Sequence, residues 1–347
     1  MRQALTVKQE IRYPQSRRLS IRHVADAAGV SMMTVSRALR GIDGVSEPTR
    51  ARIATIAREM GYVPNGNARA LAETNSKLIG LSLPNLFNDV FADILEGMRR
   101  TLHGAGYSTV IDTTDYDPLR ELDWFERMTI WRPAAVVLTG CTHADQLRGH
   151  LTRSPLPVVE LWDVTDTPID LCVGCDHRAA GLDLARHVAT LGYRRPAFVG
   201  PPEGLDPRAE ARITGIRQAF AEVAAQTLHR VPAEGGHAFG VGAQGFAALP
   251  KDTHDVVFFH NDNTAFGGMM AAQAAGLDVP GDIGIVGFNR LDLTRVLPRP
   301  LTTIETPRRQ IGEIAARHLL ARLNGLSPPP VTTLPCKLIP GQTVHEI

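Results

Sequence analysis

The residues with the clearest chemical potential lie in one short stretch, between positions 31 and 37. Val35 and Leu39 fall at helical spacing on one apolar side, which leaves the other residues to face outward. Those residues are Met32, Met33, Thr34, Ser36 and Arg37, with Ser31 as the cap of the helix. Hydroxyl and guanidinium groups can bond to phosphates and base edges, whereas methionine offers only apolar contact, for example to a thymine methyl group. The stretch therefore predicts a helix that presents its N-terminal residues to DNA.

A helix-turn-helix is the element that would position these residues. Ser20 can cap a preceding helix, and Gly29 supplies the tight turn between the two helices. The apolar face of that first helix is Ile21, Val24, Ala25 and Ala28. A third helix is expected with Pro48 in its first turn and Gly61 after its end. Its inward residues are Ile53, Ile56, Ala57 and Met60. A glycine-centred helical hairpin can also serve packing alone, so the distribution of charge matters.

Charge is distributed unevenly between the two ends of the chain. Residues 1–76 hold 12 Lys and Arg against 6 Asp and Glu, a net charge of +6, and residues 77–347 hold 25 against 30, a net charge of −5. The total of +1 therefore hides a basic N-terminal module joined to a mildly acidic body. This asymmetry is expected when only one end contacts phosphates.

Length and composition indicate two or three domains of a globular protein. The chain has 347 residues, of which 44% are hydrophobic and 21% charged. We find no apolar N-terminal run typical of a signal peptide and no stretch of about twenty apolar residues, so we expect a cytoplasmic protein without membrane contact. Cys141, Cys172, Cys175 and Cys336 are too few for a disulfide framework. Cys172 and Cys175 lie in an apolar strand-like run, which favours small buried side chains over metal or redox chemistry.

From Lys77 onward the sequence alternates between strand and helix patterns. The expected strands are 78–83, 107–111, 135–138, 158–161, 171–173, 197–199, 256–259 and 283–286. The expected helices are 89–102, 121–130, 178–191, 208–223 and 264–275. Strands joined by crossover helices must pair in parallel with helices on both faces, so the pattern predicts two α/β lobes of doubly wound parallel sheets. A ligand would then bind between the lobes, at the carboxyl ends of the strands.

The chain resembles transcription regulators of the lactose/galactose repressor family from about residue 19 to residue 340. The motifs that carry this resemblance are Val24-Ala-x-x-Ala-Gly-Val-Ser31, Thr34-Val-Ser-Arg37, Gly61-Tyr-Val-Pro-Asn65, Asn261-Asp262, Pro280-x-Asp-Ile-x-Ile-Val-Gly-Phe288 and Pro300-Leu-Thr-Thr-Ile304. Within the family the sequence is most similar to gluconate-operon repressors, through Pro157-Val-Val-Glu-Leu-x-Asp163, the Val-Gly-x-Asp of Val173 to Asp176, and Leu138-Thr139 followed by Thr142-His143.

The resemblance implies roles for the DNA-binding residues. Residues 66–73 match the hinge helix of the family, which orders on the operator and pairs with its dimer mate in the minor groove, and Leu71 matches the residue that wedges into the central base step. An exposed leucine in a polar linker has nothing of its own to bury against, although it could also pack back on the core. Arg37 matches a phosphate or base contact, and Met32 and Met33 occupy the two positions that vary with operator sequence. Ser31 and Asn65 are further candidates for DNA binding.

For the cleft, the resemblance implies a set of effector-binding residues. Arg212 stands where the family has its ligand-binding arginine, Asn261 and Asp262 match an Asn-Asp pair, and Asp176 matches an acidic strand-end residue. Asn289 and Arg290 replace the acid that accepts sugar hydroxyls in repressors of neutral sugars, and Arg308 lies close to the cleft in the family. Replacing a carboxylate with guanidinium groups favours an anionic ligand such as a sugar acid. Solvated surface charge is the alternative for Arg290 and Arg308.

These observations give a domain plan and a function. The plan is a basic tail at 1–18, a headpiece at 19–65, a hinge at 66–76 and an effector-binding core at 77–347. Its first lobe spans about 77–175 and 304–335, and its second lobe spans about 176–303 and the C-terminal end. The expected protein is a homodimeric repressor of a pseudo-palindromic operator, controlled by a sugar acid and needing no metal or cofactor. The absence of a leucine heptad at the C-terminus implies a dimer and not a tetramer.

The identity of the effector stays open, and two other classes of protein are alternatives to a repressor. Gluconate, a ketogluconate and another aldonate all fit the pattern, and a neutral sugar or a corepressor is the alternative within the family. A sugar-metabolising enzyme is disfavoured because the glycine-rich stretch at 235–242 lacks a phosphate-loop lysine, and the histidines show no pairing to a nucleophile. A periplasmic sugar-binding protein would need a signal peptide and no headpiece.

Overall fold

The computed structural model describes residues 19–62, 76–86, 89–233 and 235–347. The chain divides between Asn75 and Ser76 into two compact units. The candidate residues Asn65 and Leu71, with most of the expected hinge, lie outside the described residues. Within the described part of the chain, no helix is long and apolar enough to cross a membrane.

The smaller unit consists of three helices, α1 (Ile21–Ala28), α2 (Met32–Arg40) and α3 (Glu47–Glu59). Gly29 ends α1 with a φ of 63°, a left-handed conformation that glycine adopts without a Cβ clash. The core contains Val24, Ala25, Ala28, Val35, Ala38, Ile53 and Ala57, with Ile21, Leu39, Ile56 and Met60 packed against it. The predicted three-helix headpiece is confirmed, because the apolar periodicity of each helix leaves only one way to bury these residues together.

The first lobe of the larger unit is built on six parallel strands in the order β11-β5-β4-β3-β1-β2. These strands are β1 (Leu78–Leu83), β2 (Ser108–Thr113), β3 (Ala135–Thr139), β4 (Val158–Trp162), β5 (Leu171–Gly174) and β11 (Val331–Thr333). Strands β3, β4 and β5 are almost entirely buried, as expected for parallel strands with helices on both faces.

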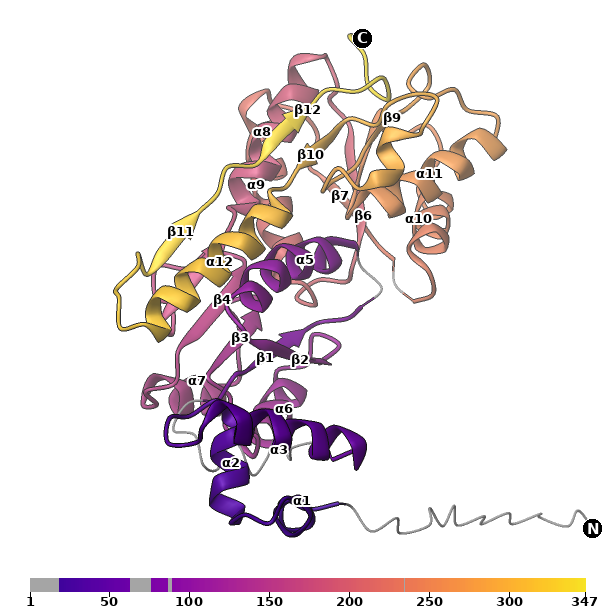
Figure 1. Ribbon diagram of the computed structural model, residues 1–347. Coiled ribbons are helices and arrows are strands. Elements are labelled where there is room, and N and C mark those ends of the chain that lie inside the picture. Colours follow the sequence, from indigo (N-terminus) through magenta and orange to yellow (C-terminus); the bar gives the residue numbers. More distant parts are fainter. Residues whose placement is uncertain (1–18, 63–75, 87–88, 234) are drawn as a thin grey trace, which may run out of the picture. The chain divides into compact units, whose positions relative to one another are not determined.

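The second lobe is built on four parallel strands in the order β7-β6-β8-β9. They are β6 (Pro196–Gly200), β7 (His229–Pro232), β8 (Val256–Phe259) and β9 (Gly284–Val286). A separate antiparallel pair joins β10 (Thr303–Glu305) to β12 (Lys337–Ile339). Figure 1 shows the two sheets as separate groups of strands within the larger unit, and the chain runs from one group to the other between β10 and α12 and again between β11 and β12.

Helices cover both sheets of the larger unit. They are α5 (Asp89–Gly104), α6 (Pro118–Thr129), α7 (Asp145–Thr152), α8 (His177–Thr190), α9 (Pro207–Glu222), α10 (Ala238–Ala247), α11 (Asp262–Ala274), α12 (Arg308–Leu323) and the short 3₁₀ helix η1 (Asp292–Arg295). Helix α12 packs on α5, α8 on α9, and α10 on α11. The α5–α12 contact requires Gly97 and Gly312, because a Cβ on these residues would lie 2.2 Å from the Arg309 carbonyl oxygen and 1.9 Å from that of Ile94.

The predicted fold class, a helical headpiece followed by a two-lobed parallel α/β core, is confirmed. Sequence periodicity did not identify α7, α10, α12, β7 or β10 to β12. Helix α10 has poor intrinsic helix propensity because it contains three glycines. Gly242 allows it to approach α11, since a Cβ there would lie 1.9 Å from the carbonyl oxygen of Thr264. The missed strands have only three or four residues each, too few for a clear periodicity.

Candidate functional site

The first candidate surface is the N-terminal end of α2. The Ser31 hydroxyl accepts a hydrogen bond from the Thr34 N–H at 3.1 Å and so caps the helix. Met32 and Met33 are 52% and 66% exposed, although large apolar side chains are normally buried. Arg37 is exposed one turn further on. The headpiece therefore presents the apolar side chains of Met32 and Met33 and the charge of Arg37 to the solvent, outside its own core.

Arginine side chains add polar contacts to the apolar packing of the three helices. Arg52 donates from Nη2 to the carbonyl oxygen of Ala28 at 3.0 Å, which connects α3 to the end of α1. Arg40 donates from Nε to the Ser36 carbonyl oxygen at 3.1 Å within α2. Thr34 and Ser36 are half-buried, so of the predicted contact residues the two methionines and Arg37 project furthest.

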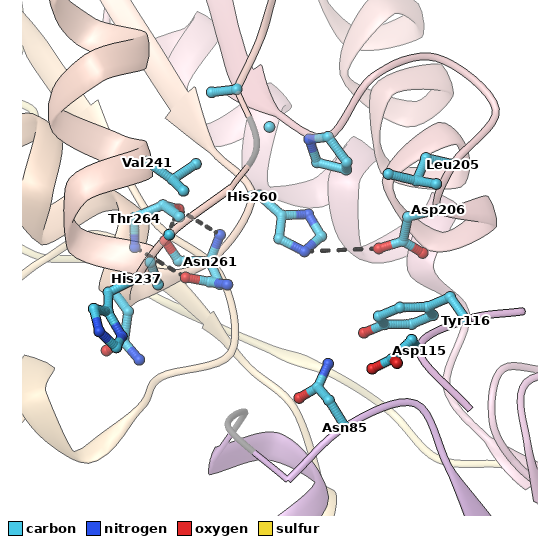
Figure 2. A pocket seen from close by; sticks show the side chains of 16 residues that line it. Asn85, Asp115, Tyr116, Leu205, Asp206, His237, Val241, His260, Asn261 and Thr264 are labelled. Carbon is cyan, nitrogen blue, oxygen red and sulfur yellow. Dashed lines mark hydrogen bonds and ion pairs between the residues drawn. The ribbon is translucent and has the colours of Figure 1, made fainter. Parts of the chain in front are cut away.

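The second candidate site is a cavity of about 660 Å³ between the two lobes of the larger unit. Asn85, Asp115 and Tyr116 contribute from the first lobe, and Asp206, His260, Asn261 and Thr264 are among the residues from the second. Figure 2 shows the first group facing the second across the opening, with His260 directed toward Asp206. As expected for parallel sheets, many of these residues follow the carboxyl ends of strands, Asn85 after β1 and His260 after β8.

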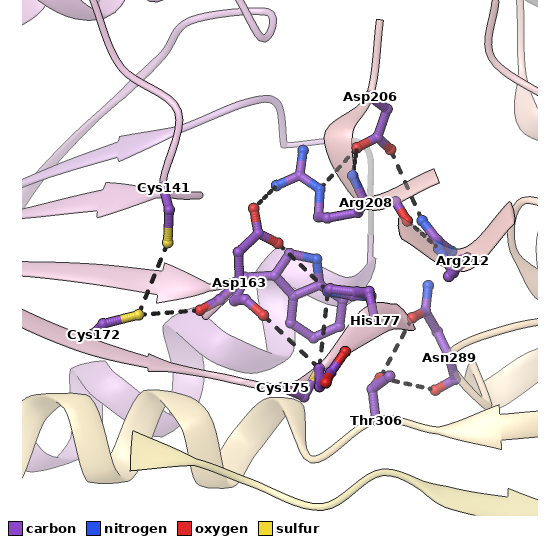
Figure 3. A network of polar contacts seen from close by, with 12 residues as sticks. Cys141, Asp163, Cys172, Cys175, His177, Asp206, Arg208, Arg212, Asn289 and Thr306 are labelled. Carbon is purple, nitrogen blue, oxygen red and sulfur yellow. Dashed lines mark hydrogen bonds and ion pairs between the residues drawn. The ribbon is translucent and has the colours of Figure 1, made fainter. Parts of the chain in front are cut away.

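A network of charged side chains lies at the inner side of this cavity (Figure 3). Asp206 caps the N-terminus of α9, and its carboxylate accepts hydrogen bonds from the N–H and the Nε of Arg208, both at 3.0 Å. Arg208 also forms an ion pair with Asp163 of the first lobe, with 3.6 Å between Nη1 and Oδ2. Its guanidinium carbon lies 5.1 Å from the centre of the Tyr116 ring. Arg208 therefore connects a helix of the second lobe to two residues of the first.

Arg212 lies one turn further along α9 and is 5% exposed. It donates from Nε to the carbonyl oxygen of Arg208 at 3.1 Å and from Nη1 to that of His260 at 2.7 Å. Its guanidinium carbon lies 4.5 Å from the centre of the Phe288 ring, and Nη2 is 3.9 Å from Asp206. These contacts hold Arg212 rigidly beneath the cavity.

Burial and neighbouring charge set the protonation states of this network. Burial raises the pKa of Asp163 to about 6, against the opposing effect of Arg208. For Asp206 the raising effect of burial is outweighed by Arg208, His260 and Arg212, so its pKa lies well below the ordinary value. Burial, followed by the charge of Arg212, lowers the pKa of His260 to about 3. The network at neutral pH thus contains two guanidinium groups and two carboxylates, of which Asp163 is the one that titrates most easily.

His177 completes the network on the side of α8. It is 4% exposed, and its Nε2 lies 3.5 Å from Oδ1 of Asp163. Burial, followed by Arg212 and Arg208, lowers its pKa well below the ordinary value, so the imidazole is neutral. A neutral imidazole adds no positive charge to Asp163, which leaves Arg208 as the main cation near that carboxylate.

The structure brings only some of the predicted effector residues to the large cavity. Asn261 lines it and caps α11, with its Oδ1 accepting from the Thr264 N–H at 2.9 Å. Arg212 contacts the carbonyl group of His260, which also lines it. Asp176 is exposed, caps α8, and lines a smaller neighbouring cavity of about 330 Å³. The other predicted residues lie beside the cavity and are mainly occupied by contacts within the protein.

Asp262 makes such contacts with both carboxylate oxygens. Oδ1 accepts from the Thr303 hydroxyl at 2.6 Å and Oδ2 from the Leu291 N–H at 2.7 Å, and the residue is fully buried. Burial raises its pKa to about 7 in spite of these hydrogen bonds. Its position connects α11 to the segments that follow β9 and precede β10.

The three residues that suggested an anionic ligand are also engaged. Arg290 pairs with Glu305 at 2.6 Å, and Arg308 pairs with Asp93 of α5 at 2.8 Å. Asn289 is 4% exposed, and its carbonyl oxygen accepts from Arg308. Since each guanidinium group faces a carboxylate of the protein, neither adds net positive charge to the cleft.

Sequence reasoning missed Asp163, Asp206, Arg208, Tyr116 and His260 as parts of the site. Two local signals were available. Arg208 and Arg212 are four residues apart, and so lie on one face of the helix that Asp206 caps. His260 directly follows the buried strand β8. Neither signal reveals the ion pair of Arg208 with Asp163, because that contact joins two lobes.

Comparison with known proteins adds to this geometry. The family described as bacterial regulatory proteins, lacI family, matches residues 20–65, and the family described as periplasmic binding protein-like domain matches residues 185–344. The chain is 33% identical over 333 residues to the HTH-type transcriptional regulator GntR of Escherichia coli strain K12, covering 95% of this chain and 100% of that relative. It is 34% identical to the GntR regulator of Pseudomonas aeruginosa, covering 89% and 90%.

Solved structures agree with these matches. A transcriptional regulator described as a LacI family protein from Silicibacter pomeroyi superposes with a TM-score of 0.88 at 36% identity, covering 94% of this chain and 99% of that structure. The match spans both the headpiece and the two-lobed core, since it covers nearly the whole of each chain.

Proposed function

The chain belongs to the lacI family of bacterial regulatory proteins, and we propose that it is a repressor whose operator affinity is controlled by a sugar acid of the gluconate or ketogluconate type. The coarser statement, that it is a DNA-binding transcriptional regulator and not an enzyme, follows from the family. The observation that carries the finer proposal is the pair of buried guanidinium groups, Arg208 and Arg212, beside the cavity between the lobes.

Operator recognition rests on the exposed end of α2. A single headpiece presents one recognition helix and so reads one half-site, and a homodimer on a pseudo-palindromic operator is therefore proposed. Met32 and Met33 supply apolar contact to bases, and Arg37 supplies charge. Asn65 and Leu71 complete the proposed contacts. Footprinting tests this arrangement, and protection of one unsymmetrical half-site would contradict it.

Effector control rests on the position of the cavity between two lobes. A ligand that contacts both lobes stabilises their closed arrangement, and in our proposal closure changes the dimer so that paired hinge segments no longer order on the operator. Such coupling is reciprocal, so saturating operator should weaken effector binding by the same factor, typically about 5- to 150-fold. Calorimetry with and without operator measures this factor. A corepressor would give coupling of the opposite sign.

One observation favours a second candidate, a neutral-sugar effector. Asp206 and Asp163 line the cavities of the cleft, and carboxylates accept hydrogen bonds from sugar hydroxyls. A thermal-shift panel of gluconate, 2-ketogluconate and glucose separates the two candidates. A ligand at a hundred times its dissociation constant stabilises the folded state by about 2.7 kcal/mol. Stabilisation by the acids alone supports our proposal, and stabilisation by glucose alone rejects it.

A further inference from the structure

We propose that Arg208, and not Arg212, binds the carboxylate of the effector, and that Asp163 is the internal carboxylate that the effector displaces from it. This inference rests on the proposed sugar-acid function, which it deepens by naming the residues that recognise the negative charge of the effector. It reverses the expectation drawn from the family resemblance, in which Arg212 is the ligand-binding arginine.

Two of the three guanidinium nitrogens of Arg212 already donate hydrogen bonds to the protein, and the third, Nη2, lies 3.9 Å from Asp206. Nε and Nη1 donate to two backbone carbonyl oxygens, at 3.1 and 2.7 Å, and the face of the guanidinium group lies on Phe288. A bidentate carboxylate pair needs two parallel N–H groups on one edge of the fork. Arg212 also lines none of the three cavities of about 660, 250 and 330 Å³ in the cleft. Its contacts indicate that it supports the site from beneath.

Arg208, in contrast, is held so that its outer edge stays available. Asp206 binds Nε at 3.0 Å, and Tyr116 lies under the guanidinium plane, so one edge and one face are fixed. The remaining contact, from Nη1 to Asp163, spans 3.6 Å and is an ion pair without a hydrogen bond. Arg208 lines both of the smaller cavities, on either side of this ion pair. A guanidinium group in this arrangement is oriented for a planar anion.

Asp163, the partner of Arg208 in this ion pair, also lacks a hydrogen bond to one oxygen of its carboxylate. Its Oδ1 is buried and accepts no hydrogen bond from the residues that the structure describes. The carboxylate thus occupies the position opposite Arg208 without the bonds that normally compensate a buried charge. It lines the same two cavities as Arg208, so a ligand that reaches one of these side chains reaches the other. An effector carboxylate bound to Arg208 would therefore replace a weak internal partner with a strong external one.

The charges around Asp163 determine what accompanies this exchange. The groups that act on it are Arg208, Asp206, Arg212 and His143, with the neutral His177 at 3.5 Å. His143 lies between two other carboxylates, 2.6 Å from Glu121 and 3.3 Å from Glu160, and these compensate its charge. With both arginines and both aspartates ionised, the network is neutral, and an added carboxylate would leave a buried negative charge.

Uptake of one proton by Asp163 restores neutrality. Because burial already raises the pKa of Asp163 to about 6, this protonation is accessible near neutral pH. The effector carboxylate stays ionised over this range. Effector affinity should then rise as the pH falls, by a factor that approaches about tenfold for each pH unit above the pKa of Asp163. The protonated Asp163 can also donate a hydrogen bond to the bound carboxylate.

The test is calorimetric titration of the full-length protein between pH 5.5 and 8.5 with gluconate and with 2-ketogluconate. The neutral probe is sorbitol, which has a hydroxymethyl group in place of the gluconate carboxylate. The variants are Arg208→Gln, Arg212→Gln as its matched control on the same helix, and Asp163→Asn as a mimic of the protonated aspartate. Thermal melting and operator binding establish that each variant is folded.

For the wild type we expect preference for the acids. Proton uptake, measured in buffers of different ionisation enthalpy, should approach one proton per ligand at pH 8 and decrease toward pH 5.5. Arg208→Gln should lose about tenfold to a hundredfold in affinity for the acids and become indifferent between acid and sorbitol. Arg212→Gln should weaken acids and sorbitol alike and keep their ratio. Asp163→Asn should bind the acids more tightly than the wild type at pH 8 and show no dependence on pH.

Three results would overturn the inference. If Arg212→Gln loses the preference for the acids over sorbitol and Arg208→Gln keeps it, Arg212 binds the carboxylate of the effector. If Asp163→Asn binds the acids more weakly at every pH, Asp163 accepts a hydrogen bond from a ligand hydroxyl and is not displaced. If the folded wild type binds sorbitol or glucose but neither acid, the proposed function fails and this inference fails with it, whereas the first two results leave the sugar-acid function intact.

Discussion

The recognition helix and the cleft use their polar residues in opposite ways. At the N-terminal end of α2, Met32, Met33 and Arg37 are exposed and largely independent of one another. In the cleft, the buried Arg208 is paired with the half-buried Asp163, within a network that joins both lobes. An exposed binding surface can change without affecting the fold, whereas each buried charge depends on its partners. Substitutions should therefore separate the two regions, with changes of stability in or beside the cleft and losses of DNA binding alone in the headpiece.

The largest effect is expected for Asp262→Ala beside the cleft. The substitution leaves the Leu291 N–H and the Thr303 hydroxyl buried without an acceptor, which should lower the free energy of unfolding by about 2 to 4 kcal/mol. Chemical denaturation measures this change. Asp292→Ala is the matched control, because that side chain is 97% exposed, and its effect should stay within about 0.5 kcal/mol. Equal changes in the free energy of unfolding for the two substitutions would contradict the expected difference between buried and exposed polar groups.

A smaller effect, of opposite sign, is expected for Asp163→Asn. The folded-state pKa of Asp163 is raised from 3.8 to about 6, so the ligand-free protein loses stability as the pH rises through this range. The variant should exceed the wild type in the free energy of unfolding by about 1 to 2 kcal/mol at pH 8, and the difference should shrink toward pH 5. Denaturation curves across this range test the sign, and a variant that is less stable at pH 8 would show that the Arg208 ion pair outweighs the cost of burial.

In the headpiece, Arg37→Ala should change DNA binding by about tenfold and leave the free energy of unfolding unchanged. If Arg37 contacts a phosphate, the slope of log affinity against log salt concentration becomes less steep by about 0.9, and specific and nonspecific DNA are affected alike. If it contacts a base, the loss is confined to the operator and the slope changes little. Binding titrations at several salt concentrations distinguish these cases, and a drop in stability would refute the independence of this surface.

The smallest expected effect concerns Met32 and Met33. Replacing either with alanine removes apolar contact to bases but no hydrogen bond, so operator affinity should fall by about tenfold or less. The side chains are 52% and 66% exposed, and stability should not change. Replacing operator thymines with deoxyuridine removes the methyl groups from the DNA instead. The wild type should bind the modified operator more weakly than the unmodified one, whereas the alanine variant should bind both operators with the same affinity.

The fold was largely predictable because its pattern is local. Val24 and Ala28 of α1 and Val35 and Leu39 of α2 recur at helical spacing, and the buried strand patterns at 78–83 and 256–259 are strands in the structure. Helices such as α10 were not predictable in this way. Its glycines oppose helix formation locally, and only the tertiary structure explains two of them, because a Cβ on Gly242 would meet Thr264 of α11 and a Cβ on Gly245 would meet Val199 of β6.

The sequence by itself determined the headpiece surface, the α/β lobes and the cleft at their strand ends, because spacing along one helix or strand decides which side chains share a face. The tertiary structure alone decided which charges meet. Asp163 follows β4 of one lobe, Arg208 lies in the first turn of α9 of the other, and their ion pair depends on how the lobes are arranged. For the same reason Arg290 and Arg308, which looked like free cations in the sequence, proved to face Glu305 and Asp93. The electrostatics of a buried site depends on distances that spacing along the chain does not contain.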